Sequence, residues 1–544
     1  METVALAQGA AFFVGVGAHL AYFNKGEHHR NGSKYVQAAT LVFAALAAAS
    51  RATLCPSWSL SVVAYLILGI YTSLVAYRML LHPLNRFPGP VGARLGDLWL
   101  SAQLGRNDMH EKSRALCDKY GPFVRVGSST LMVAHPQAVS AIHGPESRCR
   151  KASMYDLEQP NRGIATRDRA LHAARRRVWS RGFGDKRLRE YEGRVAVYVE
   201  LVLDRLHRAG GARVDATQLM NAFAFDVIGD LGLGRDFGML RSGRQHDVLQ
   251  QLTDGLGILA RRLPLWLLRL LDDMPLVPTE ATTGFRAFCH ARLDGIMASD
   301  ARDQRPIIMA PLLTHDDQLA ADERDLSVLR NDCRFIIVAG GDTVAATLAF
   351  IFYYFAKHPE SGRRLREELA PLRRGNRAFA HKDIQLADHL NAVINETLRL
   401  HPPASTITRV TPPEGIVVGD TLIPGGVTVF SSQYVLGRSG ASYVKPDEFV
   451  PERWYSRPEL IKDQAGYAPF SIGSYSCLGR SLALMEMRLL VAECVWRFDV
   501  SFAEGFDADK FRDRVTDCMS WHLGRLELCF TLRACDAENT DQAL

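Results

Sequence analysis

The sequence has 544 residues, and its 65 Lys and Arg exceed its 59 Asp and Glu to give a formal charge of +6. About half of the residues are hydrophobic and fewer than a quarter are charged, which excludes a disordered or low-complexity chain. The basic excess is too small to indicate nucleic-acid binding. The ten cysteines form no CxxC pair, so we expect reduced thiols in a reducing compartment.

Three apolar runs occupy the N-terminal part of the chain: Val4–Phe23, Val36–Ala49 and Leu60–Tyr77. A helix of about 20 residues crosses the roughly 30 Å core of a bilayer, and the first and third runs meet this length. The second run either spans with its flanks or lies at the interface. The alternative, buried helices of a soluble domain, is disfavoured because the runs lack the charge pattern of surface helices. We predict a membrane anchor of two to three transmembrane helices over residues 1–80.

The charges that flank the apolar runs predict how the anchor is oriented. Basic residues gather in the first connection and after the third run, whereas the second connection has only Arg51; they are Lys25, Arg30, Lys34, Arg78 and Arg86. Because basic loops stay on the cytosolic side, three spans place the N-terminus in the lumen and the catalytic domain in the cytosol. No basic stretch precedes the first run, so we expect no cleaved signal peptide.

A proline-rich hinge over residues 81–90 follows, with Pro88-Gly89-Pro90 as a stretch that cannot continue a helix. Residues 91–544 show no second linker and no repeat, and are predicted to form one α+β domain that is mainly α. Helical spacing marks 186–208, 215–232, 326–356, 388–400 and 478–498. Residues 123–133 predict a β-hairpin, and 415–430 predict another short sheet of three strands.

The most informative stretch is Phe470-Ser-Ile-Gly-Ser-Tyr-Ser-Cys477-Leu-Gly-Arg480. A loop with glycines at 473 and 479 presents a cysteine and opens into an apolar helix. Backbone N–H groups at a helix start favour negative charge, so we expect the pKa of the Cys477 thiol to fall. The glycines let a flat ligand approach the backbone. A lone cysteine of this kind is usually an ordinary buried residue, but the two features below favour a thiolate site.

Glu396 and Arg399 are spaced i and i+3 on one helix face, among apolar residues. A buried pair of this kind needs a further hydrogen-bonding partner, which Arg453 could supply.

The third feature is Ala339-Gly-Gly-Asp342-Thr343, within a long apolar helix. The two glycines weaken the helix and open room for a ligand, while an acid beside an alcohol suggests a proton relay. The alternative is a helix kink with a surface aspartate.

In this order and spacing, the three features resemble the cytochrome P-450 superfamily of haem-thiolate monooxygenases, over about residues 85–535. The resemblance implies that Cys477 is the proximal iron ligand and that Phe470, Gly473 and Gly479 cradle the haem. It also implies that Glu396, Arg399 and Arg453 form the structural triad of the fold. Asp342 and Thr343 match the acid–alcohol pair over the distal face of the haem.

Further haem contacts are implied by the same resemblance. His172 and Arg176, at i and i+4 in His-Ala-Ala-Arg-Arg-Arg-Val-Trp, would face the haem propionates, and Arg409 resembles the propionate-binding arginine after the Glu–Arg helix. Tyr475 departs from the family, which often has Arg or His two residues before the cysteine. A tyrosine donates one hydrogen bond but no charge, which shifts more of the anchoring onto the other three residues.

The resemblance implies a microsomal monooxygenase of the endoplasmic reticulum membrane, fungal-like, that inserts one oxygen atom of dioxygen into a hydrophobic small molecule. It carries heme b and receives electrons from NADPH through a flavoprotein reductase. Nine Lys and Arg between 167 and 189, including Arg175 and Arg177, are a candidate docking surface for that reductase. The alternatives are a haem-thiolate isomerase or dehydratase that does not use dioxygen, and a non-catalytic haem sensor. The retained acid–alcohol pair argues against both.

The residues do not identify the substrate. By resemblance, the contacting segments are 152–168, 217–240, 331–341, 402–407 and 516–522. We expect a secondary metabolite such as a terpenoid, polyketide or alkaloid, with fatty acids and xenobiotics as alternatives.

Overall fold

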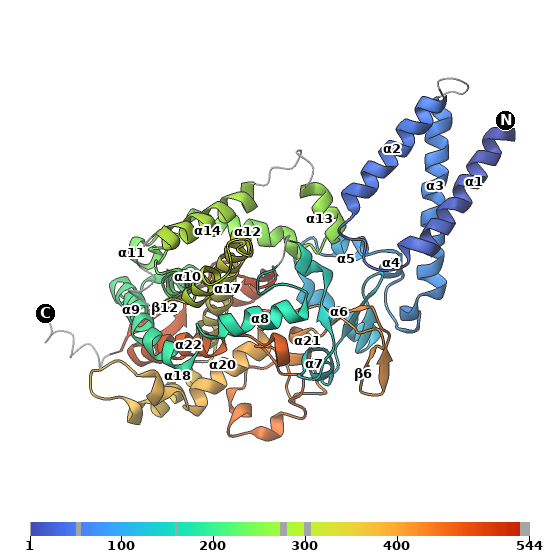
Figure 1. Ribbon diagram of the computed structural model, residues 1–544. Coiled ribbons are helices and arrows are strands. Elements are labelled where there is room, and N and C mark those ends of the chain that lie inside the picture. The colour runs from blue at the N-terminus through green and yellow to red at the C-terminus, as the bar shows by residue number, and fades with distance from the viewer. Residues whose placement is uncertain (1, 51–55, 158–161, 273–279, 299–305, 534–544) are drawn as a thin grey trace.

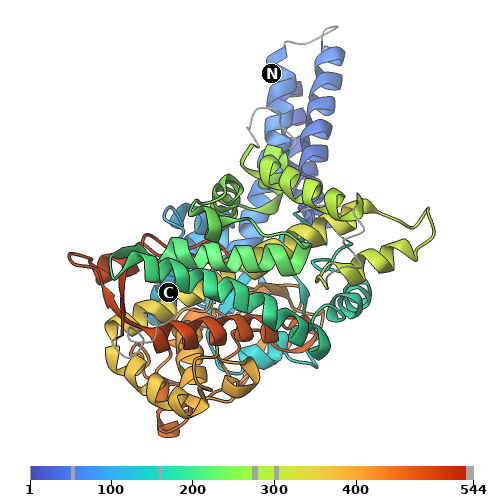
Figure 2. The same cartoon turned by 90° about the vertical axis from the view of Figure 1, so that its left-hand side faces the viewer.

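The computed structural model describes residues 2–50, 56–157, 162–272, 280–298 and 306–533. It contains many helices and a few small sheets, which confirms the predicted α+β class with helices dominant. Figure 1 shows a helical bundle at the N-terminus that projects from one corner of a much larger helical body. The same bundle stands clear of the body in the view turned by 90° (Figure 2).

The projecting bundle consists of α1 (Glu2–Ala18), α2 (Gly32–Ser50) and α3 (Pro56–Ala76), and short π-helical turns extend α1 to Phe23 and α3 to Leu81. Two stretches, Val4–Phe23 and Trp58–Leu81, are long and apolar enough to cross a membrane, in agreement with the first and third predicted runs. The second run, on α2, does not meet the same criterion within the described residues.

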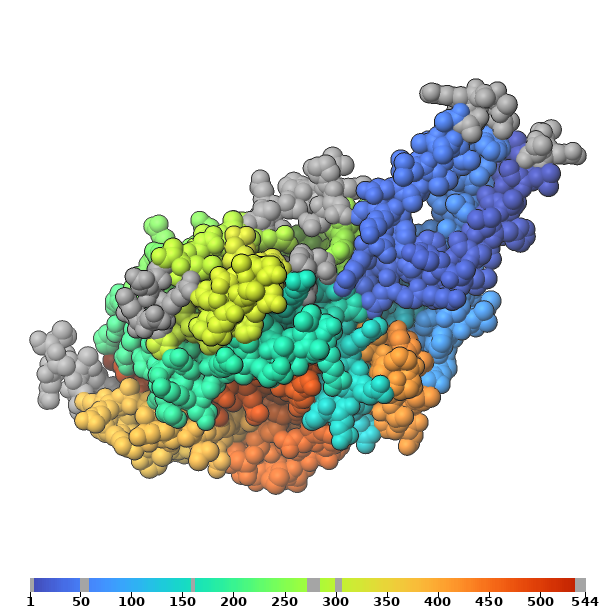
Figure 3. Space-filling view, in the orientation of Figure 1, coloured from blue at the N-terminus to red at the C-terminus, as the bar shows by residue number. Residues whose placement is uncertain are grey.

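Small residues let α1 and α3 approach closely. A side chain on Gly15 would run into the backbone of Leu66, and one on Gly69 would run into the backbone of Phe12. Close backbone approach through glycine is the usual way in which apolar helices associate in a bilayer, where burial of apolar surface gives no driving force. α1 and α3 are therefore closely packed, and Figure 3 shows the N-terminal bundle as a column attached to the body at its lower end.

The segment after α3 is fastened to the body. Pro83–Arg86 forms a 3-10 turn, and the buried guanidinium of Arg125 donates hydrogen bonds to the side chain of Asn85 (2.6 Å) and to the carbonyl of Arg78 (3.3 Å). The amide of Arg125 also donates to the carbonyl of Pro88 (2.8 Å). The proline-rich segment is thus held against the first strand of the body.

Helices form most of the body. Their bounds are α4 Val91–Leu95, α5 Leu98–Gln103, α6 Met109–Tyr120, α7 Ala138–His143, α8 Arg169–Ser180, α9 Asp185–Ala209, α10 Ala216–Leu233, α11 Met239–Ser242, α12 Asp247–Ala260, α13 Leu265–Asp272, α14 Glu280–Ala298, α16 Ala310–Asp317, α17 Leu326–Lys357, α18 Pro359–Leu369, α19 His381–Ile384, α20 Asp388–Leu400, α21 Gln433–Gly437, α22 Arg480–Arg497 and α23 Ala508–Asp513. The five predicted helices correspond to α9, α10, α17, α20 and α22 and are confirmed to within two residues at each end.

The long helix α17 runs through the core and packs along α10. By length and hydropathy α17 could also cross a membrane, but two thirds of its apolar window is buried in the protein, so it is a core helix. The two glycines of the Ala339–Thr343 motif serve this packing. A side chain on Gly340 would lie 2.5 Å from Ile228, and one on Gly341 would lie 2.6 Å from Phe225. Our expectation that these glycines open room for a ligand is therefore wrong, because α10 fills the space.

The largest sheet has five strands in the order β1-β2-β8-β5-β3. These are β1 Phe123–Arg125, β2 Thr130–Val133, β8 Thr428–Phe430, β5 Arg409–Val410 and β3 Arg150–Lys151. The predicted hairpin is confirmed as β1 and β2. The predicted sheet over 415–430 is wrong in one respect: β6 (Ile416–Val418) pairs with β7 (Thr421–Ile423), but β8 joins β2 and β5 instead. Pro424-Gly425-Gly426 turns the chain away between β7 and β8.

Two smaller sheets complete the body. One has the order β4-β12-β9, formed by Arg213–Asp215, Glu527–Leu532 and Phe498–Phe502. The other is the short hairpin of β10 (Thr516–Asp517) and β11 (Trp521–His522), which contacts α17.

Candidate active site

Cys477 lies in a loop that a hydrogen bond within the loop backbone closes. The amide of Cys477 donates a hydrogen bond to the carbonyl of Phe470 (2.8 Å), which closes the loop before α22 begins. Gly473 has a φ of +68°, a conformation that favours glycine, and a side chain there would collide with the carbonyl of His143. The side chain of Cys477 is exposed. A side chain on Gly479 would make only ordinary contacts, at 3.8 Å from Phe183 and 3.9 Å from the Cys477 sulfur. The thiol therefore faces open space.

The predicted fall in the pKa of the thiol is wrong for the protein alone. Although the side chain of Cys477 is exposed on one side, desolvation by the surrounding protein atoms raises the pKa of the thiol above its ordinary value. Hydrogen bonds from the backbone N–H groups of Gly479 and Arg480 and the charge of Arg176 lower it, but they do not outweigh burial. A thiol that coordinates a metal ion loses its proton outright, so metal binding, not the loop, would supply the thiolate.

Two arginines and a histidine lie beside this loop. Arg176 donates to the carbonyl oxygen (2.7 Å) and the hydroxyl (3.0 Å) of Ser476, next to the cysteine. The ring centroids of His172 and Tyr475 lie 4.7 Å apart, and the guanidinium carbon of Arg409 lies 4.8 Å from the centroid of the Tyr475 ring. The three predicted propionate-binding residues and Tyr475 are thus brought together on one side of the loop.

Lys151, which our sequence analysis missed, completes the group. In the pairing of β3 with β5, Lys151 stands directly opposite Arg409, and both side chains are buried. The Lys151 ammonium also donates to the carbonyl of Ile164 (2.7 Å) and lies 3.1 Å from Nδ1 of His172. No motif or periodicity marks a two-residue strand, so only the sheet register reveals this lysine.

The cations of this group carry the unpaired positive charge that an anion-binding site requires. Among the residues that the structure describes, Lys151, Arg176 and Arg409 form no ion pair with a carboxylate. Asp332, whose charge acts on Lys151, is paired with Arg175 at 2.6 Å. The Nε of Arg409 and the hydroxyl of Tyr475 are buried with no hydrogen-bond partner in the described chain. Like charges opposite each other in a sheet are destabilising. Two carboxylates would satisfy these donors, so the residues fit the propionate edge of a haem next to Cys477.

We expect Lys151 to make haem retention depend on pH. Burial, followed by repulsion from Arg409 and Arg176, lowers the pKa of Lys151 to about 7. In the haem-free protein, the free energy of unfolding is reduced because a protonated Lys151 is buried beside other cations. This reduction is complete below pH 7 and disappears as pH rises towards the ordinary pKa of a lysine. A bound propionate reverses the shift, so binding requires a proton at Lys151, and haem affinity falls as pH rises above about 7, at most tenfold per pH unit.

The rate of haem transfer to an excess of a haem-free acceptor protein, measured between pH 6.5 and 9, checks this expectation. Lys151→Met should release haem faster at pH 6.5 and should lose the part of the pH dependence that the lysine contributes. Identical pH profiles for the two proteins would exclude Lys151 from the anion site.

The acid–alcohol pair lies on α17, although its two side chains have different partners. Asp342 is largely buried, and its Oδ2 atom, which accepts no hydrogen bond from the described residues, lies 3.9 Å from Nε2 of His522 on β11. Burial raises the pKa of the Asp342 carboxyl, and the charge of nearby His522 partly opposes this. The Thr343 hydroxyl donates to the carbonyl of Ala339 (2.8 Å), so its oxygen stays free to accept. Asp342 is thus no surface aspartate.

The Glu396–Arg399 pair is buried, as predicted. Both side chains are fully buried, and Arg399 binds Glu396 through two hydrogen bonds of 2.8 Å. Arg453 is the predicted further partner and donates to Glu396 at 3.0 Å. The indole of Trp454 (2.9 Å) and the amide of Val450 (2.8 Å) also donate to this carboxylate. The pair thereby joins α20 to the 450–454 segment and has the satisfied hydrogen bonds that a buried ion pair requires.

Comparison with known proteins decides the family. The cytochrome P450 family model matches residues 88–522, which include the cysteine loop, the Glu–Arg pair and the acid–alcohol pair. The chain belongs to the cytochrome P450 family. It is 64% identical over 470 residues to the cytochrome P450 monooxygenase sthD of Phaeosphaeria nodorum, covering 86% of this chain and 99% of the relative.

Other fungal P450s are similar over nearly their whole length. The cytochrome P450 monooxygenase notG' of Aspergillus versicolor is 40% identical, with 95% of this chain and 96% of the relative covered. Tryprostatin B 6-hydroxylase of Aspergillus fumigatus is also 40% identical, with 96% of each chain covered. Membership of this family implies a haem cofactor, which agrees with the anion site beside Cys477.

Proposed function

We propose that this P450 is a membrane-bound monooxygenase that inserts one oxygen atom of dioxygen into a hydrophobic small molecule in secondary metabolism. The observation that carries the proposal is the exposed thiol with an unpaired cation group beside it, and a largely buried acid next to an alcohol on α17 supports it. The similar fungal proteins bear the names of monooxygenases, and one is named as a 6-hydroxylase, so hydroxylation is the proposed reaction.

The residues divide the work between binding and proton delivery. Cys477 would hold the iron of heme b, and Lys151, His172, Arg176, Arg409 and Tyr475 would hold its propionates, while Phe470, Gly473 and Gly479 shape the loop beneath it. A haem bound through a cysteine thiolate supplies dioxygen chemistry, because electron donation from the thiolate favours O–O cleavage. Asp342 would pass protons towards Thr343, and His522 lies where it can exchange a proton with Asp342.

Electrons are proposed to come from NADPH through a flavoprotein reductase, the partner expected for a P450 of this type. The candidate docking surface needs a correction, since Arg175 is buried against Asp332 and cannot contact a partner. The exposed basic residues of the same region are Arg169, Arg177, Arg181, Lys186 and Arg189, on α8, α9 and the turn between them. A reductase with an acidic surface would dock on these residues, on the side of the protein from which Arg176 reaches the cysteine loop.

The anchor is proposed to place the body on the cytosolic face of the endoplasmic reticulum membrane. In Figure 1 the N-terminus lies at the far end of the bundle, and the connection between α1 and α2 lies at the end next to the body. This arrangement supports the predicted topology, because the basic first connection and the body then share one side of the membrane. The proposed substrate is a hydrophobic secondary metabolite, which could reach the protein from the bilayer.

Variants of the acid–alcohol pair test the proposal. In Thr343→Ala the fold and the haem should persist, but electrons from NADPH should drain into hydrogen peroxide, because the distal alcohol that receives protons is gone. Asp342→Asn should slow turnover by about 10², since an amide does not exchange protons as a carboxylate does. The measurement compares NADPH consumed, peroxide formed and product formed with reductase present. Thr347→Ala, which removes a hydroxyl one turn further along α17, is the matched control.

The alternatives give different results in the same assay. A haem-thiolate isomerase or dehydratase would turn over a peroxide substrate without reductase, and neither variant would uncouple it. A haem sensor would form no product. Tight coupling with wild-type turnover in Thr343→Ala would contradict the proposed proton relay.

A further inference from the structure

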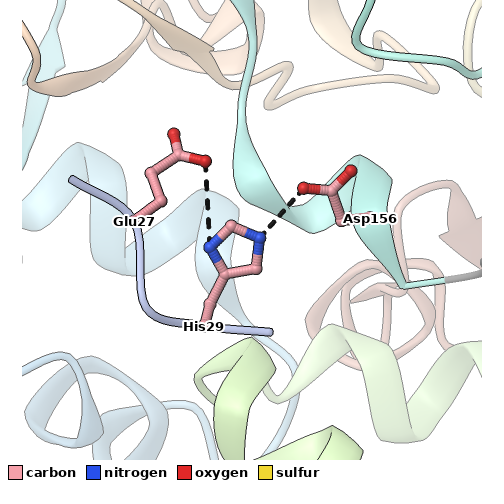
Figure 4. A group of neighbouring side chains, drawn as sticks. All are labelled: Glu27, His29 and Asp156. Carbon is pink, nitrogen blue, oxygen red and sulfur yellow. Dashed lines mark hydrogen bonds and ion pairs between the residues drawn. The ribbon is translucent and has the colours of Figure 1, made fainter. Parts of the chain in front are cut away.

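The loop between the first two anchor helices, residues 24–31, binds the body through an ion-pair network. His29 on this loop lies between two carboxylates, with Nε2 at 2.9 Å from Asp156 and Nδ1 at 3.9 Å from Glu27 (Figure 4). Arg30 pairs with Asp156 at 2.6 Å. Asp156 lies in the 3-10 turn η4 (Ser153–Asp156), and its side chain is only 2% exposed. The loop therefore reaches a buried acid of the body across more than 120 positions of sequence.

Arg167 connects this contact to the proposed haem site. Its guanidinium donates to Glu27 (2.6 and 2.7 Å) and to Asp156 (2.6 Å), while its Nε donates to the backbone carbonyl of Lys151 (3.0 Å). Lys151 is the cation opposite Arg409 in the anion site. A short chain of contacts thus runs from the anchor loop through Arg167 to the strand that presents a haem-facing lysine.

A helix of the body that packs against α2, α13, also binds this acid. Arg269 on α13 donates to the backbone carbonyl of Asp156 (2.6 Å), and the backbone of Trp266, also on α13, lies against Gly32 at the start of α2. Burial disfavours ionisation of Asp156, but hydrogen bonds from His29, Arg30 and Arg167 outweigh it and hold the pKa of this carboxyl well below its usual range. Asp156 is therefore charged at neutral pH and stays bound to its cationic partners.

Glu27, His29 and Asp156 together could be taken for metal ligands, since their ligand atoms lie close to one another. Guanidinium groups already neutralise both carboxylates: Arg167 contacts both, Arg30 contacts Asp156, and Arg150 lies 3.7 Å from Glu27. An added cation would have to displace these charges, so the trio belongs to an ion-pair network.

We propose that the 24–31 loop acts as a clamp: it holds in place the segments 150–157 and 162–168, which border the proposed haem site. Asp156 and Arg167 are the positioning residues through which the membrane anchor fixes these segments. The proposal rests on the haem site proposed above, because its consequence is felt at Lys151. The anchor is then part of the machinery that shapes the haem and substrate pocket, and the orientation of its helices in the bilayer bears on that pocket.

The test uses the full-length haem protein in lipid nanodiscs and a variant confined to the loop, Glu27→Gln with His29→Gln and Arg30→Gln. Hydrogen–deuterium exchange of peptides covering 147–157 and 162–172 should rise by about tenfold, and haem transfer to an acceptor protein should quicken several-fold, because partly buried charges lose their partners. Lys25→Gln, which removes a charge from the same loop at a residue without an ion pair in the described chain, should change neither quantity.

A coupling measurement separates positioning from a general loss of stability. If Glu27 acts through Arg167, the effects of Glu27→Gln and Arg167→Gln should not be additive. The double variant should show hydrogen–deuterium exchange and haem loss no faster than those of Arg167→Gln alone. Additive effects would contradict the clamp. Unchanged exchange in both peptides in the triple variant would show that the loop is a passive connection.

An Arg409→Gln arm distinguishes failure of the clamp from failure of the haem site. Faster haem loss in Arg409→Gln with no change in the triple variant would overturn the clamp and leave the haem site intact. No change in haem loss in Arg409→Gln would overturn the haem site on which the clamp rests.

Discussion

Replacing Cys477 by serine should abolish the thiolate–iron absorption of the haem protein and its monooxygenase activity. A serine hydroxyl stays protonated at neutral pH and is a poor ligand for iron, whereas a cysteine is deprotonated when it binds a metal. In this protein burial outweighs the hydrogen bonds of the loop and keeps the pKa of the thiol above its ordinary value, so the thiolate depends on the metal. The carbon-monoxide difference spectrum of the dithionite-reduced protein measures the effect.

Cys529→Ser is the matched control, because Cys529 is a partly exposed cysteine of β12, outside the loop. It should keep the thiolate spectrum and the activity of the wild type. Wild-type activity in Cys477→Ser, or a spectrum typical of neutral-imidazole ligation in the wild type, would refute Cys477 as the iron ligand.

Glu396→Ala should prevent the protein from folding into a form that holds haem. The substitution leaves Arg399 and Arg453 buried without their shared carboxylate, and the loss of one partner of a buried ion pair costs about 3–5 kcal/mol. The amide of Val450 and the indole of Trp454 also lose their acceptor. The expected result is a large fall in the yield of soluble, haem-loaded protein, measured from the haem absorbance relative to total protein.

The surface of the same protein offers a control with identical spacing. Arg187 and Glu190 also form an i,i+3 pair, but their side chains are 39% and 33% exposed, and such pairs contribute less than about 1 kcal/mol. Glu190→Ala should therefore fold and bind haem normally. Soluble, haem-loaded Glu396→Ala protein would show that the buried pair does not hold α20 to the 450–454 segment.

The elements predicted most accurately are those whose signal is local. Helical periodicity predicted α9, α10, α17, α20 and α22 to within two residues, because the apolar spacing that marks a helix lies within the segment itself. In α9, for example, the buried residues recur every three to four positions. The sheet over 415–430 was only partly correct, since the partner of a strand depends on where distant chain lies. β8 has the alternation of a strand, but its hydrogen bonds go to β2 and β5 and not to β7.

Two errors in the site have a common cause. We expected the glycines of α17 to leave room for a ligand and Arg175 to face a partner protein, and in both cases another part of the body occupies that space. Neither the packing of α10 against α17 nor the position of Asp332 beside α8 leaves a trace in the local sequence. Residue type indicates what a side chain can do, while its surroundings decide whether it does so.

By itself the sequence determined the apolar N-terminal helices, the long helices, the cysteine loop and the Glu–Arg pair, because each is a pattern of neighbouring residues with a direct physical meaning. Only the tertiary structure revealed Lys151 opposite Arg409, His522 beside Asp342, and the anchor loop bound to Asp156. These contacts join residues that lie far apart in the chain, and they form only when packing of the core closes the intervening loops. Periodicity reports which face of an element is buried, but it contains no information on what that face, or a charged side chain beside it, will meet.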